Sequence, residues 1–246
     1  MREILTEGLS QMGITPPGGA VEQLERYAQM LTEKNQVMNL TAITTTEGIA
    51  RLHFLDSAAV LAYGAAVSRK DGGARWLAGK SVIDVGTGAG FPGVVIRILE
   101  PSVELTLLDS LGKRVDWLRE SCEALSLSQV RCLHARAEEQ ALLPGFRDSF
   151  DVAVSRAVAS LPLLCELCLP YVKPGGVFLA LKSVDSDAEI AAAASAIKRL
   201  GGELLPPLDY PIPGGEVSHR LTAIRKVSHT PKGLPRKWSR IKKEPL

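Results

Sequence analysis

The sequence predicts an α/β protein in which a mostly parallel, seven-stranded sheet follows a helical N-terminal region. Two patterns predict this class. From residue 81 onward, short apolar runs of strand length alternate with amphipathic segments, which is typical of a parallel sheet covered by helices. The stretch Ser81–Gly93 reads as a buried strand, a glycine-rich loop and the start of a helix, a unit whose backbone N–H groups can meet a ligand. We therefore expect a ligand site beside this loop.

Residues 1–70 form the predicted helical N-terminal region. Helices are expected at 5–12, 21–31 and 49–64, interrupted by the Thr15–Gly19 break and by a polar, threonine-rich loop at 35–46. The segment 68–75, SRKDGGAR, has the composition of a linker and marks a domain boundary near residue 70.

Residues 71–228 form the predicted sheet domain, and 229–246 form a basic C-terminal tail. Strands are expected at 82–85, 104–108, 130–133, 151–154, 177–181, 203–208 and 220–225. Helices are expected at 94–99, 112–125, 161–169 and 185–200.

Composition indicates a cytoplasmic, reduced, soluble protein. The chain of 246 residues is 46% hydrophobic and 23% charged, which is ordinary for a globular protein with a full core. It has no apolar run of membrane-spanning length and no signal-peptide core, and four cysteines do not suggest a secreted disulfide scaffold. We expect a monomer that binds no metal and no membrane.

The charge of the chain is unevenly distributed. Residues 219–246 carry nine Lys or Arg against Glu244, a net charge of +8, so the remainder is about −6. A basic end on an otherwise acidic protein favours a polyanionic partner, and the alternative is a solvated, disordered tail.

The glycine loop favours one of several ligands. The spacing Asp84-x-Gly86-x-Gly88-x-Gly90 differs from the dinucleotide fingerprint because Phe91 occupies the place of its third glycine. The glycine loop does not end in a Lys-Ser/Thr pair, so a P-loop is excluded. The pattern resembles the first motif of class I S-adenosylmethionine methyltransferases, which have a Rossmann-like sheet. The turn Lys173–Gly176 before a strand resembles a second motif of that class.

Ligands of open α/β sheets bind beyond the carboxyl ends of the strands. That rule selects the glycine loop, Asp109, Ala137-Glu138, Ser155-Arg156 and Lys182. Asp109 lies where an acid could accept hydrogen bonds from both hydroxyls of a ribose. Cys165 and Cys168 form a C-x-x-C, but no second pair completes a zinc site, so we expect core packing.

The segment Ser155–Ser160 limits the chemistry of the site. It contains neither the Asn/Asp-Pro-Pro-aromatic segment typical of exocyclic-amine methylation nor the cysteine of pyrimidine carbon-5 methylation. A ring nitrogen with a free lone pair, such as guanine N7, needs neither and loses no proton.

The whole chain resembles the glucose-inhibited division protein B (GidB, RsmG) family, the guanine-N7 methyltransferases of bacterial 16S ribosomal RNA. The matching pieces are Asn39–Ile43, His53–Ser57, Asp84–Gly93, Leu108–Ser110, Lys113-Arg114, Arg136–Glu139, Ser155–Ala157, Lys173–Gly176, Thr230–Lys232 and Pro235. The tail from Leu234 onward departs from the family pattern, although its basic character is kept.

The resemblance implies a role for each matched position. S-adenosylmethionine would be bound by the glycine loop at Gly86, Gly88, Gly90 and Phe91, by Asp109, Ser110 and Leu111 around the ribose, and by Ala137 and Glu138 at the adenine. Arg156 would stand beside the methionine end or the target guanine, and no general base is expected.

The partner implied is small-subunit ribosomal RNA or the small ribosomal subunit. The candidate RNA-binding residues are Lys182, Arg225, Lys226, Lys232, Arg236 and Lys237. Trp238 could stack on a base or could anchor the tail, and removal of residues 230–246 is expected to spare cofactor binding. The rival interpretations are a small-molecule or protein methyltransferase of the same fold and a non-enzymatic RNA-binding protein.

Overall fold

A computed structural model of the chain describes residues 1–68 and 75–246. The N-terminal helices are α1 (Arg2–Gln11), α2 (Ala20–Met38), α3 (Thr46–Gly48), the π-helix η1 (Ile49–Leu55) and α4 (Asp56–Ser68). The predicted helical region is thus present, although α2 extends into the expected loop and the last helix begins as a π-helix. Most of the predicted 68–75 linker, with the boundary near residue 70, lies outside the described residues.

The remaining elements alternate as predicted from residue 81. The strands are β1 (Ser81–Val85), β2 (Glu104–Asp109), β3 (Val130–His134), β4 (Phe150–Arg156), β5 (Val172–Ser183), β6 (Gly202–Leu204), β7 (Leu208–Pro211) and β8 (Ser218–Lys226). The helices are α5 (Gly93–Leu99), α6 (Gly112–Ala124), α7 (Ala137–Gln140), α8 (Leu161–Cys168), the 3-10 turn η3 (Leu169–Tyr171), α9 (Asp187–Ala192), α10 (Ala194–Arg199) and α11 (Trp238–Lys243).

These strands form one sheet in the order β3-β2-β1-β4-β5-β8-β6, with β7 also paired to β8. The strands β1 to β5 are parallel, and β8 runs antiparallel to β5. The sheet has eight strands rather than seven because the strand expected at 203–208 is two short strands on the same edge of β8. Pro206 and Pro207 lie between them, and proline has no N–H to donate to a ladder.

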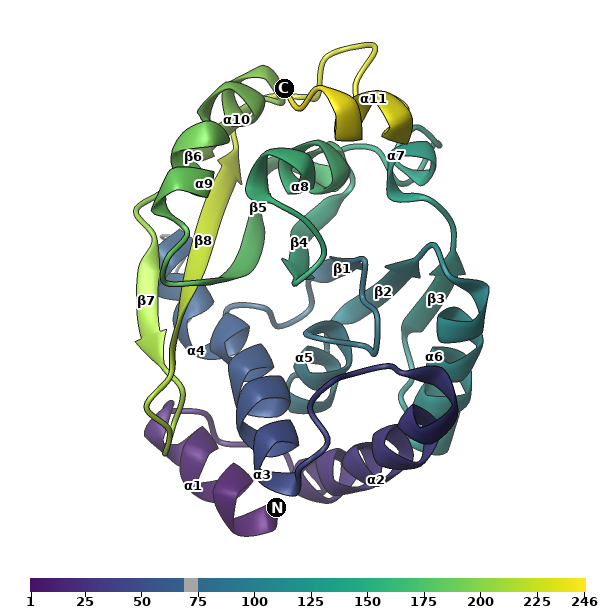
Figure 1. Cartoon of the computed structure of the whole chain (residues 1–246), viewed down its shortest axis with the longest axis vertical. Coiled ribbons are helices and arrows are strands. Elements are labelled where there is room, and N and C mark those ends of the chain that lie inside the picture. The colour runs from purple at the N-terminus through teal and green to yellow at the C-terminus, as the bar shows by residue number, and fades with distance from the viewer. Residues whose placement is uncertain (69–74) are drawn as a thin grey trace.

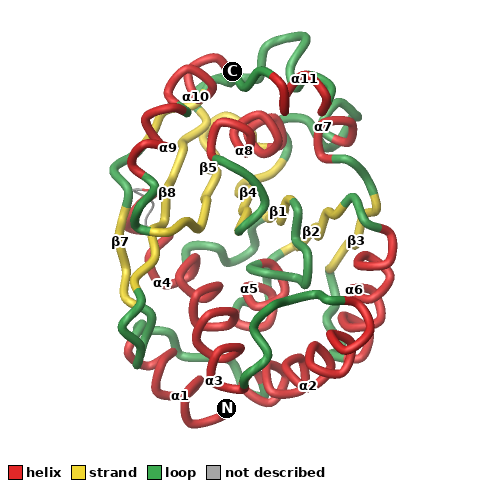
Figure 2. Tube along the Cα trace, in the orientation of Figure 1, coloured by secondary structure: helices red, strands yellow, loops and turns green. Residues whose placement is uncertain are grey.

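Helices cover both faces of the sheet (Figures 1 and 2). On one face, α1, α2, η1, α4, α5 and α6 pack in a core that runs from Leu5 to Ala223 and includes alternate sheet residues such as Val82 and Leu107. On the other face, α8, α10 and α11 pack against the intervening residues, such as Ile83 and Phe178. Buried side chains alternate between the faces because successive residues of a strand point in opposite directions.

The N-terminal helices are joined to the sheet domain through its core. The Tyr27 ring is fully buried, stacks on Trp117 of α6 with centroids 5.9 Å apart, and donates its hydroxyl hydrogen to the Ala89 carbonyl of the glycine loop. This contact ties α2 to the loop that forms the site.

Among the helices of the described residues, none has both the length and the apolar composition that a membrane span needs.

Cys165 and Cys168 lie in α8 with no exposed surface. Their predicted role in the core is confirmed.

Candidate cofactor and substrate site

Asp84 fixes the shape of the glycine loop from below. Its Oδ2 accepts hydrogen bonds from the Thr87 hydroxyl at 2.7 Å and from the Gly93 N–H at 2.8 Å, so it joins the two ends of the loop. The carboxyl is fully buried, and burial raises its pKa to about 7. Asp84 therefore acts on the loop and not on a ligand.

Glycine is needed at two positions of the loop for different structural reasons. Gly90 has φ of +88°, and a Cβ there would lie 2.7 Å from a Val94 methyl group and close to Tyr27. Gly88 has φ of +58°, yet a Cβ there would approach nothing nearer than 3.9 Å. Gly90 is thus required for packing, whereas Gly88 faces open space where a ligand can approach the backbone.

Asp109 ends β2 beside that open space. Its Oδ2 accepts a hydrogen bond from the Gly88 N–H and its Oδ1 accepts one from the Leu111 N–H, both at 2.9 Å. The residue is 5% exposed, and its carboxylate is held in one orientation by these two bonds. Each carboxylate oxygen has a further lone pair with which it can accept a ligand hydroxyl.

Two cavities meet at Asp109 and share Gly86, Ser110 and Val158. The smaller, about 180 Å³, is lined by residues that include Ala137 and Glu138. The larger, about 420 Å³, is lined by Thr41, His53, Gly86–Ala89, Phe91, Asp109–Leu111, Arg114 and Arg156–Val158. Nine of the ten cofactor positions expected from the sequence therefore line this double cavity, and Gly90 lies behind it.

Arg156 ends β4 at the far wall of the larger cavity. Its Nη1 donates to the Leu52 carbonyl at 2.9 Å and to Asp56 Oδ2 at 2.8 Å, and its Nη2 lies 3.0 Å from His53 Nδ1. The guanidinium also lies 5.0 Å from the centroid of the Phe91 ring, within the range of a cation–π contact. These contacts hold a positive charge in one place at the wall of the cavity.

The bond with Arg156 determines which nitrogen of His53 carries the proton. A guanidinium can only donate, so Nδ1 of His53 accepts and its Nε2 carries the hydrogen. Nε2 then donates to the Thr41 hydroxyl at 2.7 Å, and that oxygen also accepts the Ile43 N–H at 3.0 Å. Both lone pairs of the Thr41 oxygen are engaged, which leaves its hydroxyl hydrogen to donate into the cavity that Thr41 lines.

Burial and the charge of Arg156 lower the pKa of His53 from 6.5 to about 4. Between pH 6.5 and pH 4 His53 binds a proton in the unfolded chain but not in the folded protein. The contribution of neutral His53 to the free energy of unfolding is therefore complete above pH 6.5 and is lost as the pH falls toward 4. We expect the wild type to lose about 2 kcal/mol more than His53→Gln when the pH is lowered from 7 to 5. Asp84, whose raised pKa acts in the opposite sense, is common to both proteins and cancels. Denaturant unfolding of both proteins at the two pH values measures this difference, and equal losses would contradict it.

Several site residues were not selected from the sequence alone. Asp56 is 1% exposed, and its Oδ1 accepts hydrogen bonds from the Tyr210 hydroxyl and from His219 Nδ1, each at 2.7 Å. Tyr210 and His219 are direct partners across β7 and β8. The sequence carries one signal for this group: His53 and Asp56 are three residues apart on a predicted helix, so their side chains lie on the same face. No sequence signal indicates that β7 pairs with β8 and brings Tyr210 and His219 to Asp56.

The RNA-binding candidates occupy different environments. Lys232 and Lys237 are exposed, whereas Lys182 pairs with Glu189 at 2.6 Å and Arg225 lies 3.6 Å from Glu203. The Arg236 guanidinium pairs with buried Glu166 at 2.7 Å.

The prediction that Lys226 binds RNA is wrong. Its side chain has no exposed surface, and its Nζ donates to Asp148, to the Leu169 carbonyl and to Thr230. A phosphate cannot reach this ammonium, so Lys226 stabilises the fold and is not retained as an RNA contact.

The residues present fit S-adenosylmethionine. Open space faces Gly88, a fixed carboxylate at Asp109 suits a ribose, and the buried Glu138 side chain makes no hydrogen bond to a described residue and lines the smaller cavity. A mostly parallel sheet with this strand order, followed after its first strand by this glycine loop, is the fold of a class I S-adenosylmethionine-dependent methyltransferase.

Comparison with known proteins defines the family. Residues 20–206 match the GidB family model, described as rRNA small subunit methyltransferase G, and the chain belongs to that family. A ribosomal RNA small subunit methyltransferase G from Alkaliphilus oremlandii is 41% identical over 246 residues, covering 100% of this chain and 99% of the relative.

Solved structures share the fold at low sequence identity. An Agrobacterium tumefaciens protein described as a predicted O-methyltransferase aligns with a TM-score of 0.50 and 19% identity, over 62% of this chain and 76% of its own. The protein MtNAS, in complex with MTA and tNA, aligns with a TM-score of 0.54 and 14% identity, over 84% and 71%. The chain is an S-adenosylmethionine-dependent methyltransferase of the GidB family.

Proposed function

We propose that this protein transfers the methyl group of S-adenosylmethionine to N7 of a guanine in bacterial small-subunit (16S) ribosomal RNA. The names of the relatives support the RNA class. The observation that carries the choice of atom is the state of His53. Its basic nitrogen accepts a hydrogen bond from Arg156, so it is not available to remove a proton. Guanine N7 has a lone pair and no proton, and therefore needs no base.

The cofactor would lie across the double cavity. Asp109 would accept hydrogen bonds from the ribose, and Ala137 and Glu138 would face the adenine. Its methionine end and the incoming guanine would then share the larger cavity with Arg156 and Thr41. The cofactor supplies an electrophilic methyl group on its sulfonium.

The contribution of the chain would be alignment and charge. Among the described residues that line the larger cavity, the ionisable ones are His53, Asp109, Arg114 and Arg156. Asp109 is an acid and the lowered pKa of His53 leaves it neutral at pH 7, so the two arginines are the cationic groups of this cavity that can meet an anionic RNA. Holding donor and acceptor in line can account for about 7–11 kcal/mol of a barrier.

Methyl transfer from labelled cofactor tests the proposal. Small-subunit RNA, free and as assembled particles, would be taken from cells that lack this protein, and the modified base would be identified by mass. One N7-methylguanosine is the expected product. A protein that binds cofactor but labels no RNA would contradict the ribosomal substrate and favour a protein or small-molecule substrate.

We also propose that the reaction takes place in the cytoplasm, where the proposed substrate is found, and that the protein acts as a monomer.

Exposed cations of α11 and its flank are the proposed RNA contacts. Lys237, Arg240, Lys242 and Lys243 are all exposed on this one short helix and the residue before it. Replacing all four by alanine should weaken RNA binding at least about tenfold in low salt, because each neutralised phosphate adds about 0.7–0.9 to the slope of log affinity against log salt.

Titration of RNA binding at several salt concentrations measures that slope, which should become shallower by up to about 3. Arg26→Ala removes an exposed cation of α2, which lies across the sheet from α11 (Figure 1); it is the control and should leave the slope unchanged. A slope that stays the same in the fourfold variant would remove α11 from the RNA-binding surface.

A further inference from the structure

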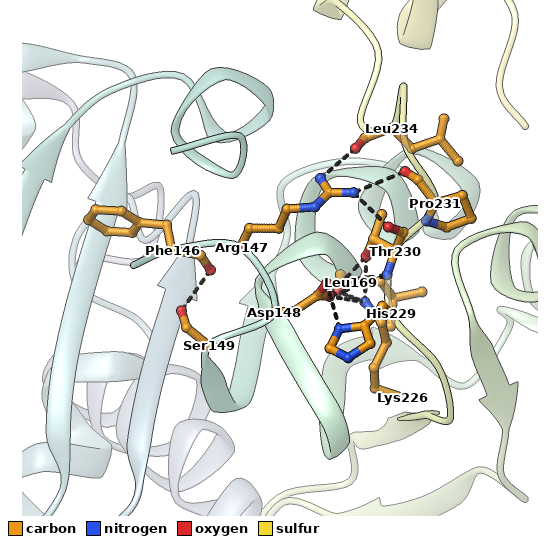
Figure 3. Close-up of polar contacts among 10 residues, drawn as sticks. All are labelled: Phe146, Arg147, Asp148, Ser149, Leu169, Lys226, His229, Thr230, Pro231 and Leu234. Carbon is orange, nitrogen blue, oxygen red and sulfur yellow. Dashed lines mark hydrogen bonds and ion pairs between the residues drawn. The ribbon is translucent and has the colours of Figure 1, made fainter. Parts of the chain in front are cut away.

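The C-terminal segment 229–246 is folded onto the sheet domain, with α11 beside α8 (Figure 1). Its first anchor is Arg147, which follows α7 in the chain. Arg147 Nη1 donates to the Leu234 carbonyl at 2.7 Å, and Nη2 donates to the carbonyls of Thr230 and Pro231 at 2.6 and 2.9 Å (Figure 3). One guanidinium thus holds three carbonyl groups of the segment.

Beside it, Asp148 binds the same segment. Its carboxylate accepts hydrogen bonds from the buried Lys226 ammonium at 2.9 Å and from the Thr230 hydroxyl at 3.2 Å (Figure 3). Burial alone would raise the pKa of Asp148, but the hydrogen bond and charge of Lys226 lower it below its ordinary value. The start of the segment is therefore fixed by paired charges.

A second anchor lies closer to α11. Glu166 of α8 has no exposed surface, and its carboxylate accepts the Arg236 backbone N–H at 2.8 Å and the Arg236 guanidinium at 2.7 Å. Ile241 has no exposed surface and Leu246 is 9% exposed, both in the core on this face of the sheet. Removing one member of such a buried pair leaves a charge without compensation, so the segment is held in one position.

These anchors place Trp238, two residues after Arg236, at the smaller of the two cavities. Trp238 lines that cavity together with Leu167 and Val158, and the carboxylate-bearing residues Asp109 and Glu138 line it too. The lining of the cavity thus combines apolar and aromatic side chains with two carboxylates. An adenine also has both kinds of surface: its two flat faces are apolar and its edge carries polar nitrogen atoms.

We propose that Trp238 is a cofactor-binding residue that forms the outer wall of the adenine pocket, so that the C-terminal segment completes the cofactor site. This inference rests on the proposed placement of the adenine in the smaller cavity. The base that Trp238 meets is then the adenine of the cofactor rather than a base of the RNA. It also reverses the expectation that removing residues 230–246 spares cofactor binding.

Calorimetric binding of S-adenosylhomocysteine and of adenosine to the full chain tests the proposal. Stacking on an aromatic ring contributes about 1–3 kcal/mol per base, so Trp238→Leu should raise both dissociation constants by about 5- to 150-fold. The factor should be the same for both ligands because the contact is with the adenine. Trp238→Phe keeps an aromatic face and should lose less. Ser239→Ala, an exposed neighbour that does not line the cavity, is the matched control.

Intrinsic fluorescence supplies a readout that does not depend on affinity alone. Trp76 and Trp117 are 3% and 2% exposed, so Trp238 should report on the bound adenine, and Trp238→Phe should remove most of the emission change caused by S-adenosylhomocysteine. Limited proteolysis of the Leu variant should show that the segment stays docked.

Asp109→Ala separates failure of this proposal from failure of the proposed site. If Asp109→Ala weakens binding while Trp238→Leu stays within twofold of wild type, the role of Trp238 is overturned and the site stands. If neither variant weakens binding, the adenine lies elsewhere and both proposals are overturned.

Discussion

Replacing Asp109 by alanine is expected to raise the dissociation constant of S-adenosylmethionine at least about 100-fold. Its carboxylate is held by the Gly88 and Leu111 N–H groups, so it arrives in the geometry that a ribose requires. Each hydrogen bond to a charged group contributes about 1.5–3 kcal/mol, and two such bonds to the ribose would be lost. Asp109→Asn keeps one carbonyl oxygen and should have an intermediate effect. Calorimetry measures both constants.

The control for this change is Asp116→Ala on α6. Asp116 is an exposed carboxylate that pairs with Arg119 at 2.7 Å, and it lines neither cavity. Its loss should leave cofactor affinity unchanged. Thermal unfolding should show that the Asp109→Ala protein remains folded, because the two released N–H groups lie at a cavity open to water. An unchanged dissociation constant in a folded Asp109→Ala protein would remove Asp109 from the site.

Replacing Asp56 by alanine is expected to destabilise the protein by about 3–5 kcal/mol, which lowers the melting temperature by roughly 10 °C. Burial alone would raise the pKa of this carboxyl, but hydrogen bonding to His219 and the charge of Arg156 lower it, so the group is ionised. Its removal leaves the Arg156 guanidinium, whose side chain is 13% exposed, without its compensating charge. Calorimetric or denaturant unfolding measures the loss.

Two further variants make this prediction specific. Asp185→Ala removes an exposed carboxylate and should change stability by no more than about 0.5 kcal/mol. The double variant Asp56→Ala with Arg156→Ala should be less destabilised than the sum of the single changes, because each single change strands the other charge. Strict additivity would show that the two side chains are not coupled.

Local patterns were sufficient for most of the sheet domain. Alternation of apolar runs with helical segments located β1, β2, β3, β4, β5 and β8, because buried strands need apolar residues on both faces when helices cover both. The glycine spacing and the acid at the end of the second strand indicated the cofactor class, since those residue types are set by the backbone shape of the loop and by the ribose. The strand at 203–208 was predicted as one because its apolar residues outweighed Pro206 and Pro207.

The wall of the larger cavity depended on long-range contacts. Arg156 was selected as a residue at the end of a strand, but its partners His53 and Asp56 are about a hundred residues earlier in the chain. Tyr210 and His219 reach Asp56 only because β7 pairs with β8 in one register. No local pattern encodes such a meeting.

The sequence by itself determined the α/β class, the glycine loop and the acid at Asp109, because each depends on residues close together in the chain. Only the tertiary structure decided which cations are available to a partner. Lys226 and Lys237 are equivalent in a count of charge, yet one is enclosed by Asp148 and Thr230 and the other is exposed. The folded C-terminal segment likewise brings Trp238 to the cavity that Glu138 lines, although Glu138 lies 100 residues earlier in the chain. Burial and proximity of this kind arise from packing between distant segments, which composition and spacing do not specify.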